Sequence, residues 1–195
     1  MGERVLHFLL INGYGCHLDT PLGRVYLPRM LKFIKENVPD YIILLGGFTQ
    51  RKSAPGVSEA KLMLTWFFDQ MSTPDQKRFL IEENSYTTLE NSRNGAILIP
   101  RILGLTMSDD HLPEIKITHG CEATRAANII MLDRYFMGGL VKSIDDITVE
   151  TASWERADPF RQVKTLIHDK LAITYPWLGL AERERRKRIR RSAEI

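Results

Sequence analysis

The densest group of polar side chains in the chain spans residues 82–91 and reads EENSYTTLEN. Its carboxylates could move protons or hold a cation, and its hydroxyl and amide groups could hydrogen-bond a ligand. Helix initiation explains part of this run, because Thr87 and Glu90 have the spacing of a capping box. Capping does not account for Glu82, Ser85 or Asn91. The candidate site residues of this run are therefore Glu82, Ser85, Thr88, Glu90 and Asn91.

A second polar group lies at residues 118–125 and reads THGCEATR. Arg125 could clamp a phosphate or carboxylate through two parallel hydrogen bonds, or it could pair with Glu122 on a helix surface. His119 could act as an acid or base, but we favour a structural role, in which it bonds a neighbouring loop. The candidates of this group are Thr118, His119, Glu122 and Arg125.

Two further groups of candidate residues contain glycines. Gly13 and Gly15 lie in the run NGYGC, and Gly46-Gly47 comes shortly before Ser58-Glu59. Glycines at such places let the backbone turn tightly or approach a ligand, and free N–H groups at a helix start can bind an anion. Ser58 is also a good N-cap, with Glu59 favourably placed in the first helical turn. The third glycine of a dinucleotide fingerprint is missing, so NAD binding is not expected.

Alternating strand and helix patterns connect these groups. Apolar runs predict strands at residues 5–11, 41–45, 78–82, 114–118 and 146–151, and three- and four-residue spacings predict helices at 24–37, 58–71, 88–103 and 122–135, with another beginning near 158–159. Such a chain predicts an α/β fold, a Rossmann-like doubly wound three-layer sandwich with a mostly parallel five-stranded sheet.

This fold brings the candidate residues together. Ligands of such sheets bind beyond the carboxyl ends of the strands, and the polar groups follow successive predicted strands. We therefore expect one pocket bordered by Gly13, Gly46, Gly47, Glu59, Ser85, Asn91 and Thr118. If the strand order is 3-2-1-4-5, the two cysteines, Cys16 and Cys121, follow neighbouring strands as free thiols.

Length and charge predict one domain with a basic end. The 195 residues, of which 44% are hydrophobic, suit a single domain at residues 1–180 followed by a tail at 181–195. Residues 182–191 read ERERRKRIRR. We interpret this segment as a solvated helix whose arginines pair with Glu182 and Glu184. Nucleic acid is therefore not an expected partner. Deleting residues 182–195 is expected to leave ligand binding unchanged.

The opening apolar stretch, residues 5–11, is too short to span a membrane and lacks a signal-peptide cleavage site. The two cysteines show no CxxC spacing, which indicates neither a disulfide scaffold nor a zinc site. These features favour a cytoplasmic protein in a reducing compartment. The sequence carries no signal for oligomeric state.

The ordered motifs resemble those of the YdcF/SanA/ElyC-like family. They comprise Gly46-Gly47, Ser58-Glu59-Ala60, Glu82 and Ser85 with Thr88 and Glu90-Asn91, then Thr118 and Arg125-Ala126; Arg24 is similar to the arginine that opens the family's first helix. The resemblance covers about residues 5–136 and implies a Rossmann-like fold with a shared charged pocket. In relatives a histidine usually lies three residues before the arginine, where this chain has Glu122. Many relatives also carry an N-terminal membrane anchor, which we do not expect in this chain.

Three functions fit these observations. The first is an enzyme that hydrolyses, or transfers a group from, a phosphorylated or nucleotide-like small molecule, with a glutamate as base or with glutamates and His119 holding a divalent metal. The second is a binding protein for an adenosine-bearing ligand such as S-adenosylmethionine, whose hydroxyl and amino groups the carboxylates would bind. The third is an RNA-associated protein acting through the arginine-rich segment.

Overall fold

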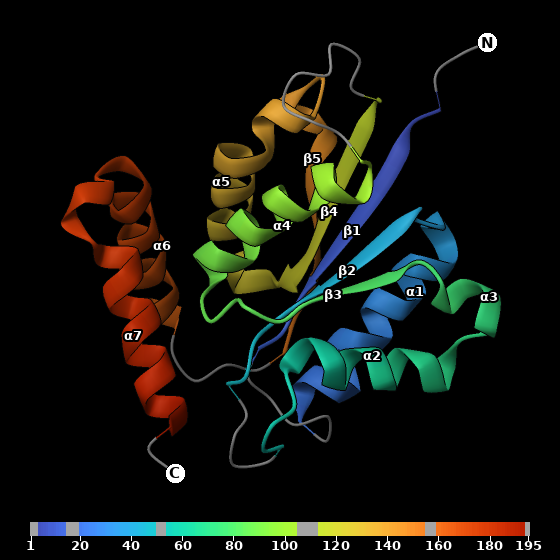
Figure 1. The fold of residues 1–195 in the computed structure, drawn as a ribbon, viewed down its shortest axis with the longest axis horizontal. Helices are drawn as coiled ribbons and strands as arrows, with labels where there is room; N and C mark the ends of the chain where they lie inside the picture. Colours follow the sequence, from blue (N-terminus) through green and yellow to red (C-terminus); the bar gives the residue numbers. More distant parts are fainter. Residues whose placement is uncertain (1–3, 15–19, 50–53, 105–112, 155–158, 194–195) are drawn as a thin grey trace.

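A parallel five-stranded sheet forms the centre of the molecule, as the apolar runs predicted. In the computed structural model, which describes residues 4–14, 20–49, 54–104, 113–154 and 159–193, the strands lie in the order β3-β2-β1-β4-β5 and all neighbours run parallel (Figure 1). The strands are β1 (Leu6–Asn12), β2 (Tyr41–Leu45), β3 (Phe79–Glu82), β4 (Ile115–Glu122) and β5 (Ile147–Ala152). This confirms the Rossmann-like α/β class and the 3-2-1-4-5 order.

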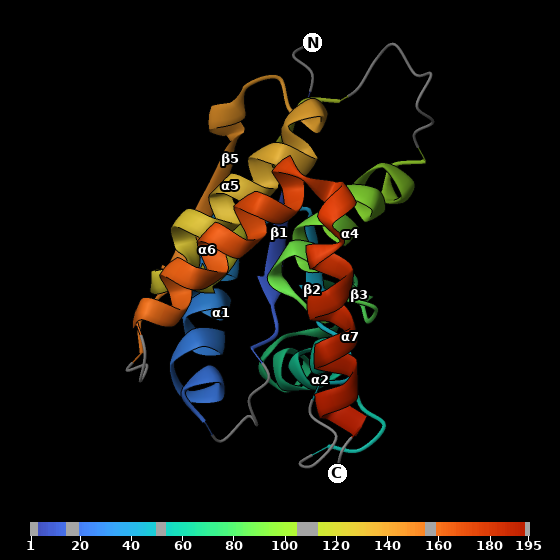
Figure 2. The same ribbon diagram turned by 90° about the vertical axis from the view of Figure 1, so that its left-hand side faces the viewer.

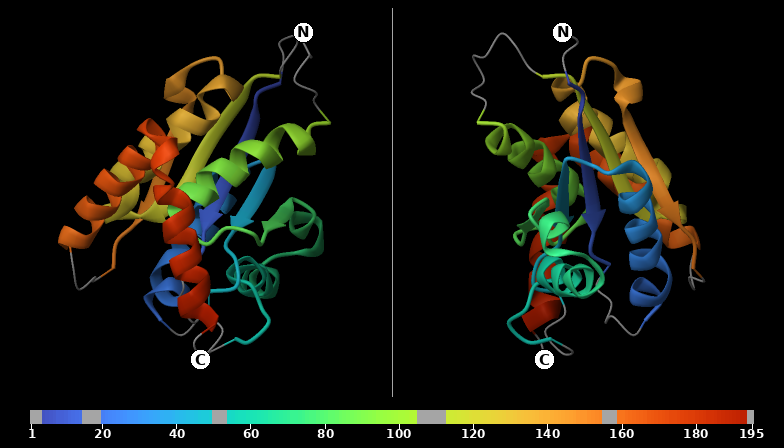
Figure 3. Two further views of the ribbon diagram at one scale, coloured as in Figure 1. Left: turned by 60° about the vertical axis from the view of Figure 1, so that its left-hand side comes forward. Right: turned by 90° about the vertical axis from the view of Figure 1, so that its right-hand side faces the viewer.

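Helices cover both faces of the sheet. They are α1 (Leu27–Asn37), α2 (Glu59–Gln70), the short α3 (Thr73–Gln76), α4 (Thr88–Ile102), α5 (Ala126–Met137), α6 (Pro159–Thr174) and α7 (Leu180–Ala193). Leu9 and Ile11 of β1 face the core under α1 and α2, whereas Phe8 and Leu10 face the core under α4 and α5. Figure 3 shows further views of the helices around the sheet. This alternation follows from the two-residue period of a strand that is buried on both faces.

Several predicted boundaries differ from the structure, two of them in ways that bear on the site. β4 continues to Glu122, four residues beyond the predicted end, because its pairing with β5 extends to the register Glu122↔Ala152. The first helix begins as a π-helical turn, Leu22–Tyr26, before α1 starts at Leu27. The longer β4 changes the site, because His119 lies inside the strand rather than in the loop after it.

The basic segment is a helix that folds back onto the body of the protein. α6 packs on α5, and α7 returns alongside α6 toward the carboxyl edge of the sheet (Figures 1 and 2). Leu180 and Ala181 at the start of α7 pack on the cluster of Leu89, Leu132 and Ala172. Within α7, Arg186 pairs with Glu182 and Arg188 pairs with Glu184, as expected. The picture of a separate solvated tail is wrong, since α7 lies against the domain.

No helix in the described part of the chain is both long and apolar enough to cross a membrane.

Candidate functional site

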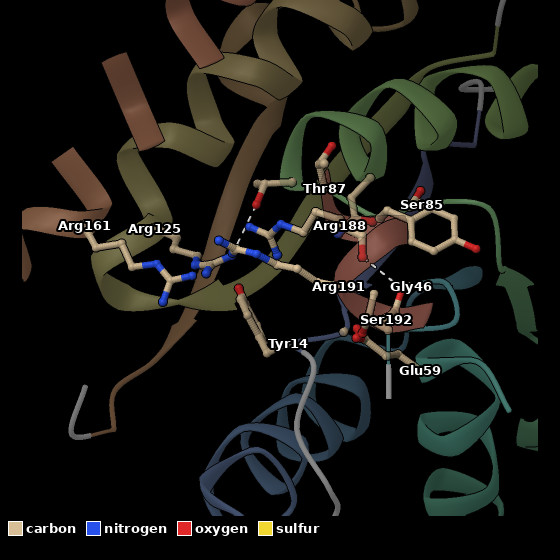
Figure 4. A pocket seen from close by; sticks show the side chains of 15 residues that line it. Tyr14, Gly46, Glu59, Ser85, Thr87, Arg125, Arg161, Arg188, Arg191 and Ser192 are labelled. Atoms are coloured by element: carbon tan, nitrogen blue, oxygen red, sulfur yellow. Dashed lines mark hydrogen bonds between the residues drawn. The ribbon is translucent and has the colours of Figure 1, made fainter. Parts of the chain in front are cut away.

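A polar pocket opens at the carboxyl edge of the sheet, at the place where the fold predicts ligand binding. Its volume is about 260 Å³, and Figure 4 shows it from close by. The lining residues come from strand ends, from the starts of α2, α4 and α6, and from the last turns of α7. They are Gly13, Tyr14, Gly46, Thr49, Glu59, Ser85, Tyr86, Thr87, Thr88, Asn91, Arg125, Arg161, Arg188, Arg191 and Ser192. Of the seven residues predicted to border the pocket, all but Gly47 and Thr118 do so.

Glu59 is the one acidic side chain among the described residues that line this pocket. The other glutamates predicted as site residues lie elsewhere. It is the first residue of α2 and is almost fully buried. Two glycines make room for it: a Cβ at Gly13 would overlap Oε2 of Glu59, and a Cβ at Gly46 would lie 2.8 Å from the Glu59 Cβ. Gly13 and Gly46 therefore serve the close approach of a carboxylate to the backbone at the ends of β1 and β2.

The idea that these glycines and the start of α2 offer free N–H groups to an anion is wrong. The Gly46 amide donates to the Glu82 carbonyl at 3.0 Å, and the Gly47 amide donates to the Ser85 carbonyl at 2.7 Å. In the first turn of α2, the amide of Glu59 donates to the Gly47 carbonyl at 3.0 Å, and Ser58 caps the amide of Lys61. Gly47 and Ser58 are therefore structural, and neither lines the pocket.

Four arginines give the pocket its positive charge. Arg125 follows β4 in the 3-10 turn Ala123–Arg125, where its Nη1 donates to Thr88 Oγ1 at 3.2 Å and its guanidinium lies 5.1 Å from the centre of the Tyr14 ring. Arg161 comes from the start of α6, and Arg188 and Arg191 come from α7. Figure 4 shows these guanidinium groups gathered beside Tyr14. Of these four arginines, Arg125 alone was predicted as a site residue from the sequence.

Hydroxyl and amide groups occupy the other end of the pocket, near Glu59 (Figure 4). Ser85 is buried, with its Oγ donating to the Glu82 carboxylate and accepting from Asn94 Nδ2 at 3.0 Å. Asn91 Nδ2 donates to Asn12 Oδ1 at 2.6 Å. Two buried oxygens here, Asn91 Oδ1 and Thr49 Oγ1, have no hydrogen-bond partner among the described residues.

Two predicted catalytic carboxylates hold the loop before α4 instead of lining the pocket. Glu82 accepts hydrogen bonds from the amide of Asn84 at 2.8 Å and from Ser85 Oγ. Glu90 accepts from the amide of Tyr86 at 2.8 Å and forms an ion pair with Arg185 of α7 at 3.3 Å. Neither carboxylate lines the pocket, so the geometry gives no support to the catalytic role predicted for them.

Glu122 and His119 are also structural. Glu122 is buried and caps the following turn, accepting from the amide of Thr124 at 3.0 Å and from its hydroxyl at 2.5 Å. His119 is fully buried on the α5 side of β4, where its Nδ1 bonds Asp133 at 2.8 Å. His119 was expected to bond a neighbouring loop, whereas its partner is a residue of α5. Neither His119 nor Glu122 lines the pocket, so the geometry gives no support to the catalytic alternative for them.

Three predicted ligand-binding residues lie away from the pocket or outside the described residues. Thr118 points to the α1 side of β4, where its Oγ1 bonds His7 Nε2 at 2.9 Å and Thr148 at 3.1 Å. Arg24 is exposed on the π-helical turn before α1 and does not line the pocket. Gly15 lies outside the described residues, as does Cys16, so the pairing of the two cysteines across the edge is not described.

The proposed metal set does not come together. In the part of the chain that the structure describes, no three histidine, cysteine, aspartate or glutamate side chains lie close enough to hold a metal ion. Glu59 lies in the pocket, whereas His119 lies beneath α5 on one face of the sheet. Cys121 is a buried thiol, and burial raises its pKa to about 12, with a further increase from the nearby Asp133.

Several lining residues escaped sequence reasoning: Tyr14, Thr49, Tyr86, Thr87, Arg161, Arg188, Arg191 and Ser192. The arginine-rich run was visible, but its side chains have no local pattern that shows which of them turn toward the domain. The contact of α7 with the domain is visible only in the structure. Ser192, a small residue after the charged run, is almost fully buried, so the last turn of the helix contacts the body.

Comparison of the chain with protein-family models, with curated proteins and with solved structures found no match.

Proposed function

We propose that this protein is an enzyme that binds a phosphorylated small molecule and hydrolyses it or transfers its phosphoryl-bearing group, with Glu59 as general base. The observation that carries the proposal is the composition of the pocket: four arginines surround a hollow whose described lining contains one acidic side chain, Glu59. Arginine binds phosphate through paired, charge-assisted hydrogen bonds. A positive pocket also stabilises the negative charge that develops during phosphoryl transfer.

The reaction follows from the position of Glu59. Its carboxylate would take a proton from water or an acceptor hydroxyl, whose oxygen then attacks phosphorus while the bond to the leaving group breaks. Ser85 is fixed by Glu82 and Asn94 and can orient the attacking group. Arg125 is fixed against Thr88 and Tyr14 and would hold the phosphoryl oxygens.

S-adenosylmethionine is the weaker candidate ligand. It carries a sulfonium and an ammonium group against one carboxylate, so its net charge is positive. Of the glutamates proposed to bind it, Glu59 alone lines the pocket, together with four arginines. Like charges would repel in that space, which favours an anion. The third candidate, RNA, is disfavoured because Arg188 and Arg191 face a small hollow and not an open groove.

We also propose kinship with the YdcF/SanA/ElyC-like family and a cytoplasmic location. Six residues of the motifs that carry the resemblance line this pocket; they are Gly46, Glu59, Ser85, Thr88, Asn91 and Arg125. The free thiol of Cys121 supports a reducing compartment.

Binding of phosphate is tested by calorimetric titration with pyrophosphate. Arg125→Ala removes a charge-assisted hydrogen bond of about 1.5–3 kcal/mol, which corresponds to a loss of affinity of roughly ten- to a hundredfold. Arg134→Ala is the matched control, because Arg134 is exposed on α5 and does not line the pocket. Equal affinity in Arg125→Ala and Arg134→Ala would contradict the proposal.

Catalysis is tested by phosphate release from a panel of phosphate esters. Glu59→Gln retains the size of the side chain but cannot accept a proton at neutral pH. We expect turnover to fall by about 10²–10⁴-fold while pyrophosphate affinity is kept or increases. Full turnover in a folded Glu59→Gln variant would remove Glu59 from the reaction and leave a binding protein.

A further inference from the structure

The two ends of the pocket differ in chemistry. Arginines gather beside Tyr14, whereas Glu59 and Ser85 lie away from them (Figure 4). Asn91, which also lines the pocket, hydrogen-bonds Asn12 at the end of β1. A ligand that fits both ends carries a phosphate on one side and groups that donate hydrogen bonds on the other. Resting on the function proposed above, we infer that the substrate is a phosphorylated sugar, free or as part of a nucleotide, whose hydroxyls bind Glu59 and Asn91.

Asn91 provides an acceptor that the described protein does not satisfy. Its side chain is more than nine-tenths buried and lines the pocket. Its Nδ2 donates to Asn12 Oδ1 at 2.6 Å, which fixes the orientation of the amide, and its Oδ1 is buried without a partner among the described residues. Buried acceptors are rarely left unpaired in native proteins, so a donor from a ligand is expected at this oxygen.

Glu59 places a second acceptor beside the first. Its Oε2 lies against Gly13, and Asn12, which holds Asn91, is the residue before Gly13. Both acceptors therefore flank the same short stretch of backbone at the end of β1. Two neighbouring acceptors suit the adjacent hydroxyls of a sugar ring, and Thr49 Oγ1, also buried without a partner among the described residues, can bond a third.

Room for a larger ligand exists beyond the arginines. A second hollow of about 200 Å³ adjoins the pocket and shares Thr87, Thr88, Arg161 and Arg188 with it. Lys164 and His168 of α6 line its far side. The outer phosphate of a nucleoside diphosphate could extend into this hollow, whereas a free sugar monophosphate would fill the first pocket alone.

The test compares ligands that differ in their hydroxyl groups. Ribose 5-phosphate and ADP are titrated calorimetrically against propyl phosphate and 2′,3′-dideoxy-ADP, which lack the hydroxyls. If a hydroxylated ligand binds, we expect its affinity to be about tenfold higher than that of the paired analogue without hydroxyls, because a site built for hydroxyls rejects analogues that lack them. Preference for ribose 5-phosphate indicates a free sugar phosphate, and preference for ADP indicates a nucleotide. These comparisons need no substitution, so they hold even if a variant fails to fold.

Asn91→Leu should then reduce the preference for the hydroxylated ligand, measured as the ratio of affinities within each pair. Asn37→Leu is the matched control, because Asn37 is exposed at the end of α1. Equal binding of the paired ligands to the wild-type protein, with Arg125→Ala still weakening pyrophosphate binding, would overturn the sugar inference and leave the proposed function standing. Failure of every phosphate to bind in an Arg125-dependent manner would overturn the proposed function itself.

Discussion

The sequence predicted a solvated tail at residues 181–195, but in the structure two arginines of α7, Arg188 and Arg191, line the pocket. If α7 forms one wall of the pocket, the double variant Arg188→Ala/Arg191→Ala should lose much of its affinity for pyrophosphate. Alanine favours helix, so the substitutions remove the guanidinium groups without breaking the helix. Both residues line the pocket, and Arg188 is held over it by Nε donating to Glu184 at 3.0 Å.

The two side chains contribute unequally. Arg188 is partly buried, with 38% of its side chain exposed, so a charge-assisted bond to a phosphate is expected to contribute about 1.5–3 kcal/mol, or roughly ten- to a hundredfold in affinity. Arg191 is exposed, and a contact screened by solvent contributes about 0.2–1 kcal/mol, or up to roughly fivefold. Arg188→Ala alone should therefore account for most of the loss.

Calorimetry at low and at physiological ionic strength measures this effect, with far-UV circular dichroism to verify that α7 stays helical. The control is Arg186→Ala on the same helix, where 69% of the side chain is exposed and the partner is Glu182. The loss should shrink as salt screens the arginines. If the double variant bound pyrophosphate as tightly as Arg186→Ala, α7 would have no part in the site, and the solvated tail would be the better description.

Four further substitutions and measurements test the architecture around the pocket. Glu90→Gln should lower the stability toward urea, by weakening the pair with Arg185, without slowing turnover at saturating substrate; a turnover defect would return Glu90 to the reaction. Gly13→Ala should displace the Glu59 carboxylate and reduce turnover, and a crystal structure with Glu59 unmoved would refute this. Cys121, whose pKa burial raises to about 12, should resist thiol reagents near neutral pH until the protein unfolds. Burial lowers the pKa of His7. The stability that its neutral imidazole contributes is therefore fully present above the pKa of histidine in the unfolded chain, about 6.5, and is lost as the pH falls toward the folded pKa. His7→Asn should flatten the decrease in urea midpoint between about pH 7 and pH 5.

The fold was predictable because its signals are local. The central strands β1 and β2 are short apolar runs buried on both faces, and the crossover helices show apolar spacings, so the order of elements and the right-handed connections leave few topologies. The position of the pocket followed from that topology. Gly13, Gly46, Glu59, Ser85, Thr88, Asn91 and Arg125 were placed correctly by it.

The direction of each side chain was not predictable from position alone. Thr118 and His119 are consecutive in β4, so they point to opposite faces of the sheet, and both lie too far back along the strand to reach its edge. Glu90 lies one residue before Asn91, but its carboxylate turns back to the Tyr86 amide and to Arg185. Such directions depend on strand length and on partners distant in sequence.

The contribution of α7 was missed for a related reason. The segment has no apolar stripe, so its attachment cannot be recognised from its own residues. It is held by the Arg185–Glu90 pair, by the stacking of Arg185 over Tyr86 at 5.5 Å, and by Leu180 at its start. These contacts join residues about a hundred positions apart, beyond the reach of any local pattern.

The position of α7 also determines when the pocket is completed during synthesis. Residues 188–192 follow every strand of the sheet in the chain, so a ribosome makes them after the parallel core could already have folded. A single proteolytic cut at the exposed Trp177, in the 3-10 turn Pro176–Leu178 between α6 and α7, would release the same wall from an otherwise intact domain. Premature termination, clipping or a bulky fusion near residue 192 would each leave a folded protein with an open, weakly charged pocket.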